Sequence, residues 1–392
     1  MNYRFANRAA VTQDSFIAEI FKYLQDKEVI SFSGGFPSPK TFPVNELQAS
    51  ALKVFTNEGA SVLQYATTNG DRDLRQIISE RYRIRQKLAI PSEQILITSG
   101  SQQALDFIGK IFLEPNDTIL IEEPSYLGAI QTFTSYEVNI KTVKLDEDGI
   151  DLEDLQAKIN KYQPKLIYLI PSFQNPSGIS YSDAKRQAVA NIIKNSNVIL
   201  VEDDPYCELY YKDGIQIPIS AQVLDQSILL GSFSKTISPG IRVGWVSSNI
   251  EIYKKLFTAK EASDLHSSSL DQRILVNYIK DYDFDTQLEK LRDQYRSQQV
   301  IMLNAINTYF PKDVKVYPNS GGMFVWIELP NGLSSIKLFY EAVKEKVVFV
   351  PGDPFYINQQ DTNTLRLSFA NETPERIVEG IQRLAKVIKQ ML

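Results

Sequence analysis

The sequence predicts an α/β protein: a large domain with a mostly parallel seven-stranded sheet flanked by helices, plus a smaller α+β domain. Between about residues 95 and 248, short apolar runs alternate with amphipathic segments, as in parallel strands joined by helices. Beyond about residue 250, long helical patterns take over and a strand-like hairpin follows them. Several of the apolar runs end directly in polar residues, at the edge where open α/β sheets bind ligands.

The first part of the chain supplies the elements of the large sheet. The expected strands are the apolar runs at 95–98, 118–122, 140–145, 166–171, 198–202, 227–230 and 243–247. Helical patterns between them cover about 102–113, 126–135, 151–161 and 181–195. This alternation favours helices on both faces of the sheet.

The remainder of the chain predicts a smaller α+β unit. Its expected elements are a helix at 284–309, a hairpin of 314–317 and 323–328, a helix near 334–346, a strand at 364–369 and a helix from 373 to 389. Thr373 and Pro374 suit the N-cap and first position of that last helix. We expect a helix near 14–26 and the segment 34–39 to join this unit, so that the domains comprise residues 1–45, 46–285 and 286–392.

Composition narrows the function. The 392 residues include 42 Lys and Arg and 47 Asp and Glu, and the resulting net charge of -5 argues against nucleic-acid binding. His266 is the only histidine, which disfavours Ser-His catalysis and a His-based metal site. Cys207 is the only cysteine, so there is no disulfide framework. Without a signal-like N-terminus or a long apolar run, we expect a cytoplasmic protein that does not enter a membrane.

Lys235 carries the most informative motif. It follows the apolar run 227–230 in the sequence Gly-Ser-Phe-Ser-Lys-Thr, and Arg242 comes seven residues later. A poorly solvated lysine has a lowered pKa and attacks carbonyl carbons, while Ser232, Ser234 and Arg242 offer donors to a phosphate. This pattern points to an imine-forming lysine in a pyridoxal 5′-phosphate (PLP) site. An ordinary surface lysine is the alternative, whereas a nucleotide-binding P-loop lacks its second glycine here.

Other strand ends fit the same cofactor. Ser101 and Gln102 open a helix whose free N–H groups favour an anion, although a plain helix cap explains them too. Asn175 offers an amide to a phenolate oxygen or simply sits in a turn. The acids at 202–204 fit a pyridine nitrogen, Mg²⁺ or a solvated turn.

Two further side chains fit a site that holds a flat ring and a carboxylate. Tyr126 follows another predicted strand and can stack on a ring, or else belongs to the core. Arg366 lies between leucines in the strand at 364–369 and needs an anionic partner, either a substrate carboxylate or a structural salt bridge.

Together these residues resemble the PLP-dependent aminotransferases of fold type I. The similarity is closest to the branch of 2-aminoadipate, kynurenine and aromatic aminotransferases, and it spans nearly the whole chain. Its motifs are residues 33–39, 171–178, 202–206, 231–245, 321–326 and 365–368, with Tyr65, Gly70, Leu74 and Arg75.

The resemblance implies a role for each site residue. Lys235 would form the imine with the cofactor and move the proton between substrate Cα and cofactor C4′. Asp203, three residues before Tyr206, would hold the pyridinium proton. Tyr206 and Asn175 would bind the 3′-oxygen, and Tyr126 would stack on the ring. The phosphate would contact Ser101, Gln102, Ser232, Ser234 and Arg242, with Tyr65 from a second subunit of a homodimer. Arg366 would bind the substrate α-carboxylate, with Asn175 and the Gly35 backbone nearby.

One departure bears on the substrate. Relatives that use 2-aminoadipate carry an arginine in the N-terminal helix, and the aligned residue here is Ala18, with Arg8 earlier in the chain. We therefore expect an aromatic, kynurenine-like or aliphatic L-amino acid as donor and a 2-oxo acid such as 2-oxoglutarate as acceptor. The alternatives are the effector-sensing domain of a transcription regulator, and a PLP lyase or decarboxylase on the same scaffold.

Overall fold

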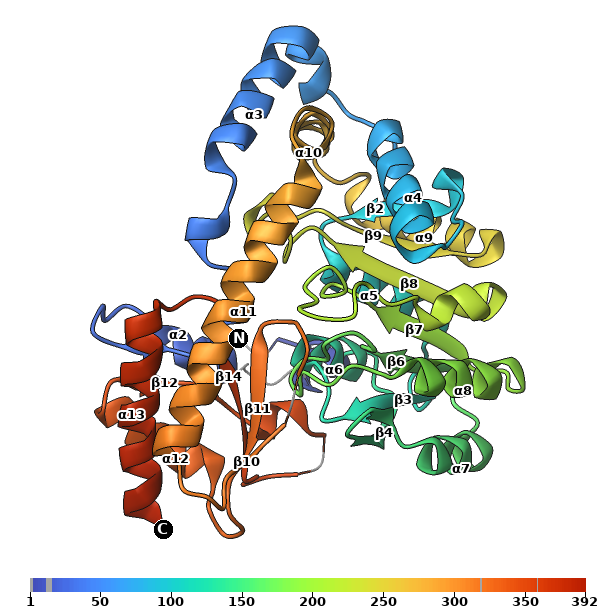
Figure 1. Cartoon of the computed structure of the whole chain (residues 1–392). Coiled ribbons are helices and arrows are strands. Elements are labelled where there is room, and N and C mark those ends of the chain that lie inside the picture. The colour runs from blue at the N-terminus through green and yellow to red at the C-terminus, as the bar shows by residue number, and fades with distance from the viewer. Residues whose placement is uncertain (1–2, 12–15, 318, 358) are drawn as a thin grey trace.

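The computed structural model describes residues 3–11, 16–317, 319–357 and 359–392. Its large sheet has the strand order β2-β9-β8-β7-β6-β3-β4-β5, and Figure 1 shows it at the right, with helices beside it. The bounds are β2 Ile95–Thr98, β3 Thr118–Glu123, β4 Asn139–Asp146, β5 Gly149–Ile150, β6 Leu166–Leu169, β7 Ile199–Asp203, β8 Ser227–Ser232 and β9 Gly244–Ser248. Neighbours from β8 through β7, β6 and β3 to β4 run parallel, whereas β9 is antiparallel to both of its neighbours.

The predicted strands are confirmed, but their number is wrong by one. The extra strand, β5, is only two residues long. It follows β4 after a short turn and pairs with the end of β4 in antiparallel orientation. So short a segment shows no alternation of apolar and polar residues, so sequence periodicity does not reveal it.

Helices cover both faces of the sheet because successive side chains of each strand point to opposite sides. α5 (Ser101–Phe112) and α6 (Leu127–Thr134) pack in a core cluster that includes Ile119 and Ile121 of β3. α7 (Leu152–Tyr162) and α8 (Asp183–Lys194) pack in another cluster around Leu120 of the same strand. These four helices confirm the expected α/β alternation.

A smaller antiparallel sheet has the order β10-β11-β14-β13, and β1 pairs in parallel with β12 beside it. The bounds are β1 Ile30–Ser31, β10 Lys315–Val316, β11 Phe324–Glu328, β12 Val347–Val348, β13 Val350–Pro351 and β14 Thr364–Ser368. The predicted hairpin is thus present as β10 and β11. The expected cap of the last helix is confirmed, since Thr373 Oγ1 accepts from Arg376 N at 3.4 Å.

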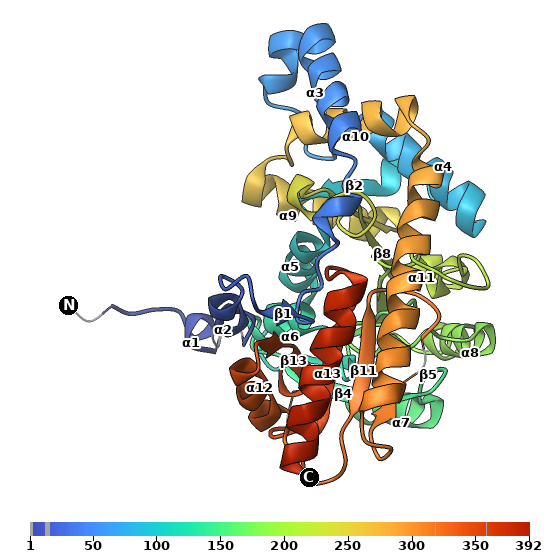
Figure 2. The ribbon, with the colours of Figure 1, turned by 60° about the vertical axis from the view of Figure 1, so that its left-hand side comes forward.

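The remaining helices surround the two sheets. They are α1 Asn7–Val11, α2 Phe16–Tyr23, α3 Val44–Glu58, α4 Arg72–Gln86, α9 Ile250–Asp264, α10 Ser269–Asp281, α11 Phe284–Tyr309, α12 Ser335–Lys344 and α13 Pro374–Met391. Residues 14 and 15 of the expected N-terminal helix lie outside the described residues. α11 runs from the end where α3 and α10 lie down to the small sheet (Figure 1). Figure 2 shows α2 beside α12, and Phe16 packs edge-on against Phe339 there. None of the helices in the described ranges combines the length and apolarity needed to cross a bilayer.

Candidate active site

A cavity of about 520 Å³ opens at the carboxyl ends of the parallel strands, between the large sheet and β14. It brings together every predicted site residue except Tyr65. These are Gly35, Ser101, Gln102, Tyr126, Asn175, Asp203, Tyr206, Ser232, Ser234, Lys235, Arg242 and Arg366. Segments far apart in the chain thus converge at the edge where an open α/β sheet binds its ligand.

Lys235 lies in the turn that follows β8, with its amine turned into the cavity. Its Nζ donates to the backbone oxygen of Gly35 at 2.8 Å. Burial, together with the positive charges of Arg366 and Arg242, lowers the pKa of Lys235 to about 8, against the opposing effect of Asp203. A substantial fraction of the amine is therefore neutral near physiological pH, as a nucleophile toward a carbonyl must be.

Asp203 ends β7 and faces the same cavity. Its Oδ2 accepts the hydroxyl proton of Tyr168 at 2.8 Å, whereas its buried Oδ1 has no hydrogen-bond partner among the described residues. Burial raises the pKa of Asp203 to about 7; the hydrogen bond from Tyr168 opposes this rise and the charge of Asp204 adds to it. A buried carboxylate oxygen without a donor fits a ligand that brings an N–H, such as a pyridinium.

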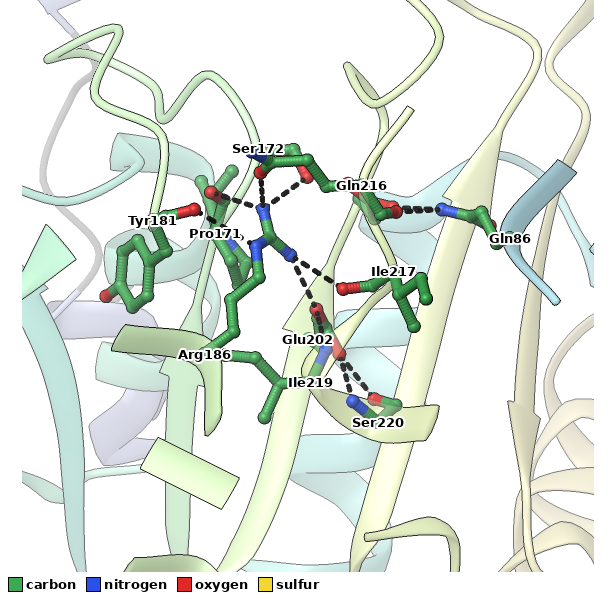
Figure 3. A network of polar contacts seen from close by, with 12 residues as sticks. Gln86, Pro171, Ser172, Tyr181, Arg186, Glu202, Gln216, Ile217, Ile219 and Ser220 are labelled. Atoms are coloured by element: carbon green, nitrogen blue, oxygen red, sulfur yellow. Dashed lines mark hydrogen bonds and ion pairs between the residues drawn. The ribbon is translucent and has the colours of Figure 1, made fainter. Parts of the chain in front are cut away.

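The neighbouring acids point elsewhere. Glu202 accepts from the Ile219 and Ser220 backbone N–H groups at 2.9 and 2.7 Å, on the side where Arg186 lies 3.9 Å away (Figure 3). Asp204 Oδ2 accepts from Gln86 Nε2 at 3.3 Å. The three carboxylates thus have different partners, and only Asp203 lines the cavity. This arrangement gives a cation no common point to bind and argues against the Mg²⁺ interpretation.

Arg366 is buried in β14 without a carboxylate opposite it. Its Nη1 donates to Asn175 Oδ1 and its Nη2 to the Ser33 oxygen, both at 2.7 Å, while Nε has no partner among the described residues. The described residues also give Arg366 no ion pair, so they contain no structural salt bridge for it. Burial lowers the pKa of Arg366 to about 10, and a desolvated guanidinium of this kind suits an incoming carboxylate.

Asn175 and Tyr206 form a second polar edge of the cavity. Asn175 Nδ2 donates to the Tyr206 hydroxyl at 3.2 Å, while Asn175 Oδ1 accepts from Arg366. Tyr126 also lines the cavity, and its hydroxyl donates to Gln102 Oε1 at 3.3 Å. Burial raises the pKa of Tyr126 to about 12, so the phenol stays neutral.

An anion cradle lies at the start of α5. Gly100 caps that helix at φ +83°, and a Cβ there would lie 2.4 Å from Arg242 Nη2. Arg242 Nη2 donates to the Ser99 oxygen at 3.0 Å, and Ser232 Oγ donates to Ser234 Oγ at 3.0 Å. A helix N-terminus, an arginine and hydroxyls around one point are suited to a phosphate.

Tyr65 is not brought into this cavity. It is 78% exposed after α3, with its ring centroid 5.8 Å from that of His266, and it lines a separate hollow. Its contribution from a second subunit therefore stays a prediction. Arg8 is exposed in α1, and the side chain of Ala18 lies outside the described residues.

Sequence reasoning missed several wall residues and all of the buried supports. Phe36 and Leu127 line the cavity and directly follow the predicted residues Gly35 and Tyr126. Gln131 also lines the cavity and lies one helical turn after Leu127. Tyr168, which holds Asp203, gave no signal, because a tyrosine within an apolar strand looks like any core residue.

Comparisons with known proteins agree with this geometry. A family model described as aminotransferase class I and II matches residues 27–384. The 2-aminoadipate transaminase of Thermus thermophilus is 39% identical over 99% of this chain and 97% of its own. The aromatic-amino-acid aminotransferase 1 of Thermococcus litoralis is 36% identical over 98% and 94%.

Among solved structures, the kynurenine aminotransferase of Pyrococcus horikoshii superposes with a TM-score of 0.94 at 34% identity, covering 99% of this chain and 97% of that one. That crystal structure is described as a complex with PMP, the substrate KYN and the product KYA. With sequence, fold and cavity in agreement, this chain belongs to the class I and II aminotransferases.

Proposed function

We propose that this aminotransferase transfers the amino group of an aromatic, kynurenine-like or aliphatic L-amino acid to a 2-oxo acid such as 2-oxoglutarate, in two half-reactions. The observation that carries the proposal is Arg366, a buried guanidinium that lines the same cavity as Lys235. Its Nε has no hydrogen-bond partner among the described residues. A carboxylate is the ligand that such a group lacks, and both amino acids and 2-oxo acids provide one.

Pyridoxal 5′-phosphate is the cofactor. When bound, it supplies an electron sink that eases removal of the proton from the substrate Cα. We assign Asp203 to its ring nitrogen, Asn175 and Tyr206 to its 3′-oxygen, and Tyr126 to its ring face. We assign its phosphate to Ser101, Gln102, Ser232, Ser234 and Arg242, with Tyr65 of the partner subunit.

The chain's own residues then have distinct tasks. Arg366, with Asn175 and the Gly35 backbone nearby, orients the substrate carboxylate and so decides which bond at Cα is presented for cleavage. Lys235, whose pKa is about 8, both accepts and returns a proton at neutral pH. Asp203 stays ionised by holding a donated N–H, which compensates for the desolvation that raises its pKa.

The cavity walls support a neutral substrate side chain. Its charged lining residues are Asp203, Lys235, Arg242 and Arg366, and each already has a task in this proposal. Phe36, Leu127 and Gln131 contribute apolar or neutral surface. Such a wall favours aromatic or aliphatic side chains over a distal carboxylate, with the modest selectivity that apolar burial provides.

We also propose a homodimer with shared active sites, in the cytoplasm. Leu63 and Tyr65 are 66% and 78% exposed and line the hollow beside His266, and an apolar patch of this kind suits a second copy of the chain. The single cysteine fits a reducing compartment. We further propose domain boundaries after residues 45 and 285. The boundary after residue 285 lies next to the start of α11 at Phe284.

A single-turnover screen tests the function. Holoenzyme is mixed with individual L-amino acids and the cofactor absorbance is followed, after which 2-oxoglutarate is added. We expect aromatic or aliphatic donors to bleach the starting band and the 2-oxo acid to restore it. Release of ammonia or CO₂ without any need for a 2-oxo acid would replace this proposal with a lyase or a decarboxylase. The regulator alternative is not favoured, since the two enzymes compared above are 39% and 36% identical to this chain, whereas the transcriptional regulator YdcR of Escherichia coli is 30% identical.

A further inference from the structure

Gln174 is completely buried, does not line the cavity, and uses all of its side-chain hydrogen-bonding capacity. Its Nε2 donates to Glu122 Oε2 at 3.0 Å and to the Pro124 oxygen at 2.7 Å. Its Oε1 accepts from the backbone N–H and the hydroxyl of Ser177 at 2.8 and 2.6 Å. Because all of its donors and acceptors have partners, the Gln174 amide has one orientation. It therefore fixes the distances between Glu122, Pro124 and Ser177.

Glu122 anchors this amide from the end of β3. It is fully buried and accepts from Gln174, from the Ile170 backbone N–H at 3.2 Å and from the Tyr181 hydroxyl at 2.9 Å. No lysine or arginine of the described ranges forms an ion pair with it. Burying a carboxylate without a cation is costly, and its retention here depends on these three donors.

The bonds of Gln174 join two segments that carry site residues. Pro124 lies two positions before Tyr126, and Gln174 lies directly before Asn175. The two segments follow β3 and β6, which are parallel neighbours in the large sheet. Both side-chain amide atoms of Asn175 bond to site residues. Its Oδ1 accepts from Arg366 at 2.7 Å and its Nδ2 donates to the Tyr206 hydroxyl at 3.2 Å.

We propose that Gln174, held by Glu122, is a positioning residue that sets the place of Asn175 relative to Tyr126, Tyr206 and Arg366. It touches neither cofactor nor substrate; it acts through Asn175, whose assigned contact is the 3′-oxygen. The inference rests on the proposed function only for that contact. Loss of the Gln174 bonds frees Asn175 and weakens a donor to an anionic oxygen, which disfavours the deprotonated form of the chromophore.

The test compares Gln174→Leu with a matched control, Gln298→Leu, in holoenzyme. Gln298 is also buried and donates to the Glu372 oxygen at 2.7 Å, but it lies in α11, away from the cavity. Both variants should lower Tm. Only Gln174→Leu should move the midpoint of the pH titration of the cofactor absorbance upward, by about 0.5 pH unit or more. It should also weaken binding of 3-phenylpropionate, a carboxylate without an amine, about 5- to 10-fold.

A second variant, Glu122→Gln, tests the same role in case Gln174→Leu does not fold. Glu122→Gln keeps the shape of the anchor but replaces one of its acceptor oxygens with an NH₂ donor, so the midpoint of this variant should move in the same direction by less. If every variant that folds has the wild-type midpoint and the wild-type affinity for 3-phenylpropionate, the positioning role is overturned. The proposed function fails separately, if wild-type holoenzyme shows no amino-acid-dependent change, because the titration midpoint needs no substrate.

Discussion

The hydroxyl of Tyr168 donates a hydrogen bond to Asp203 Oδ2 at 2.8 Å, whereas the buried Oδ1 receives no hydrogen bond from the described residues. Both side chains are buried, on the neighbouring strands β6 and β7. The tyrosine thus favours the ionised carboxylate in a place where burial alone would keep it protonated.

Replacing Tyr168 with Phe should therefore narrow the active pH range. Without the hydrogen bond, the pKa of Asp203 rises further, so the carboxylate ionises only at higher pH. We expect the acidic limb of the kcat/KM profile to move upward by up to about one pH unit. Tyr278→Phe, in α10, is the control, and identical acidic limbs in the two variants would contradict this role.

Covalent loading of the cofactor-free enzyme should depend on the protonation of Lys235. Its pKa is lowered to about 8, and only the neutral amine attacks the PLP aldehyde. The rate of loading should rise with pH up to about 8 and level off above it. Stopped-flow absorbance measures the rate, and borohydride reduction with peptide mapping should place the label on Lys235. A label on another lysine would refute the site assignment.

Arg366→Met should separate binding from stability. The substitution removes a buried guanidinium that has no ion pair among the described residues, but it also leaves Asn175 Oδ1 and the Ser33 oxygen without their donor. Tm should therefore fall only moderately, whereas kcat/KM for amino acids should fall roughly 100-fold. Calorimetry and steady-state kinetics measure the two effects. A large loss of Tm with unchanged kcat/KM would mean that Arg366 serves the fold alone.

Mixing two inactive variants tests whether Tyr65 acts across subunits. Lys235→Ala removes the amine, and Tyr65→Asp places a carboxylate where the phosphate of the other subunit would lie. Random heterodimers contain one intact site, so an equal mixture should recover roughly a quarter of the wild-type activity. Each variant is also mixed with itself, and no recovery in the heterologous mixture would contradict a role for Tyr65 in the site of the other subunit.

Gly100→Ala should weaken cofactor binding more than backbone strain explains. Its Cβ would meet Arg242 Nη2 at 2.4 Å, whereas Gly214, at a similar φ of +74°, has open space around it. Gly214→Ala thus controls for replacing a glycine of positive φ, at a cost of about 1 kcal/mol, where the added Cβ meets no neighbour. We expect PLP affinity to fall about 10-fold or more in Gly100→Ala only. Equal PLP affinities in the two variants would argue against the cradle.

The sequence predicted local features better than distant contacts. Apolar runs and their polar ends located the strands of the large sheet and the residues that line the cavity, because parallel strands deliver their carboxyl ends to one edge. The resemblance to the aminotransferase family, which places the acid three residues before Tyr206, singled out Asp203 as the one of the three acids that lines the cavity.

The supports could not be predicted in the same way. Tyr168 acts on a residue from another strand, and Gln174 meets a carboxylate 52 positions away. Such pairings arise from strand order and register, which residue patterns along one segment do not encode. The outward position of Tyr65 likewise shows only in three dimensions.

The stretch from Ser33 to Gly35 receives Arg366 at one end and Lys235 at the other. Two side chains from different sheets are thus tethered to the same three residues near the N-terminus. A change in the distance between the two sheets would therefore have to stretch one of these two hydrogen bonds or move the segment that accepts them.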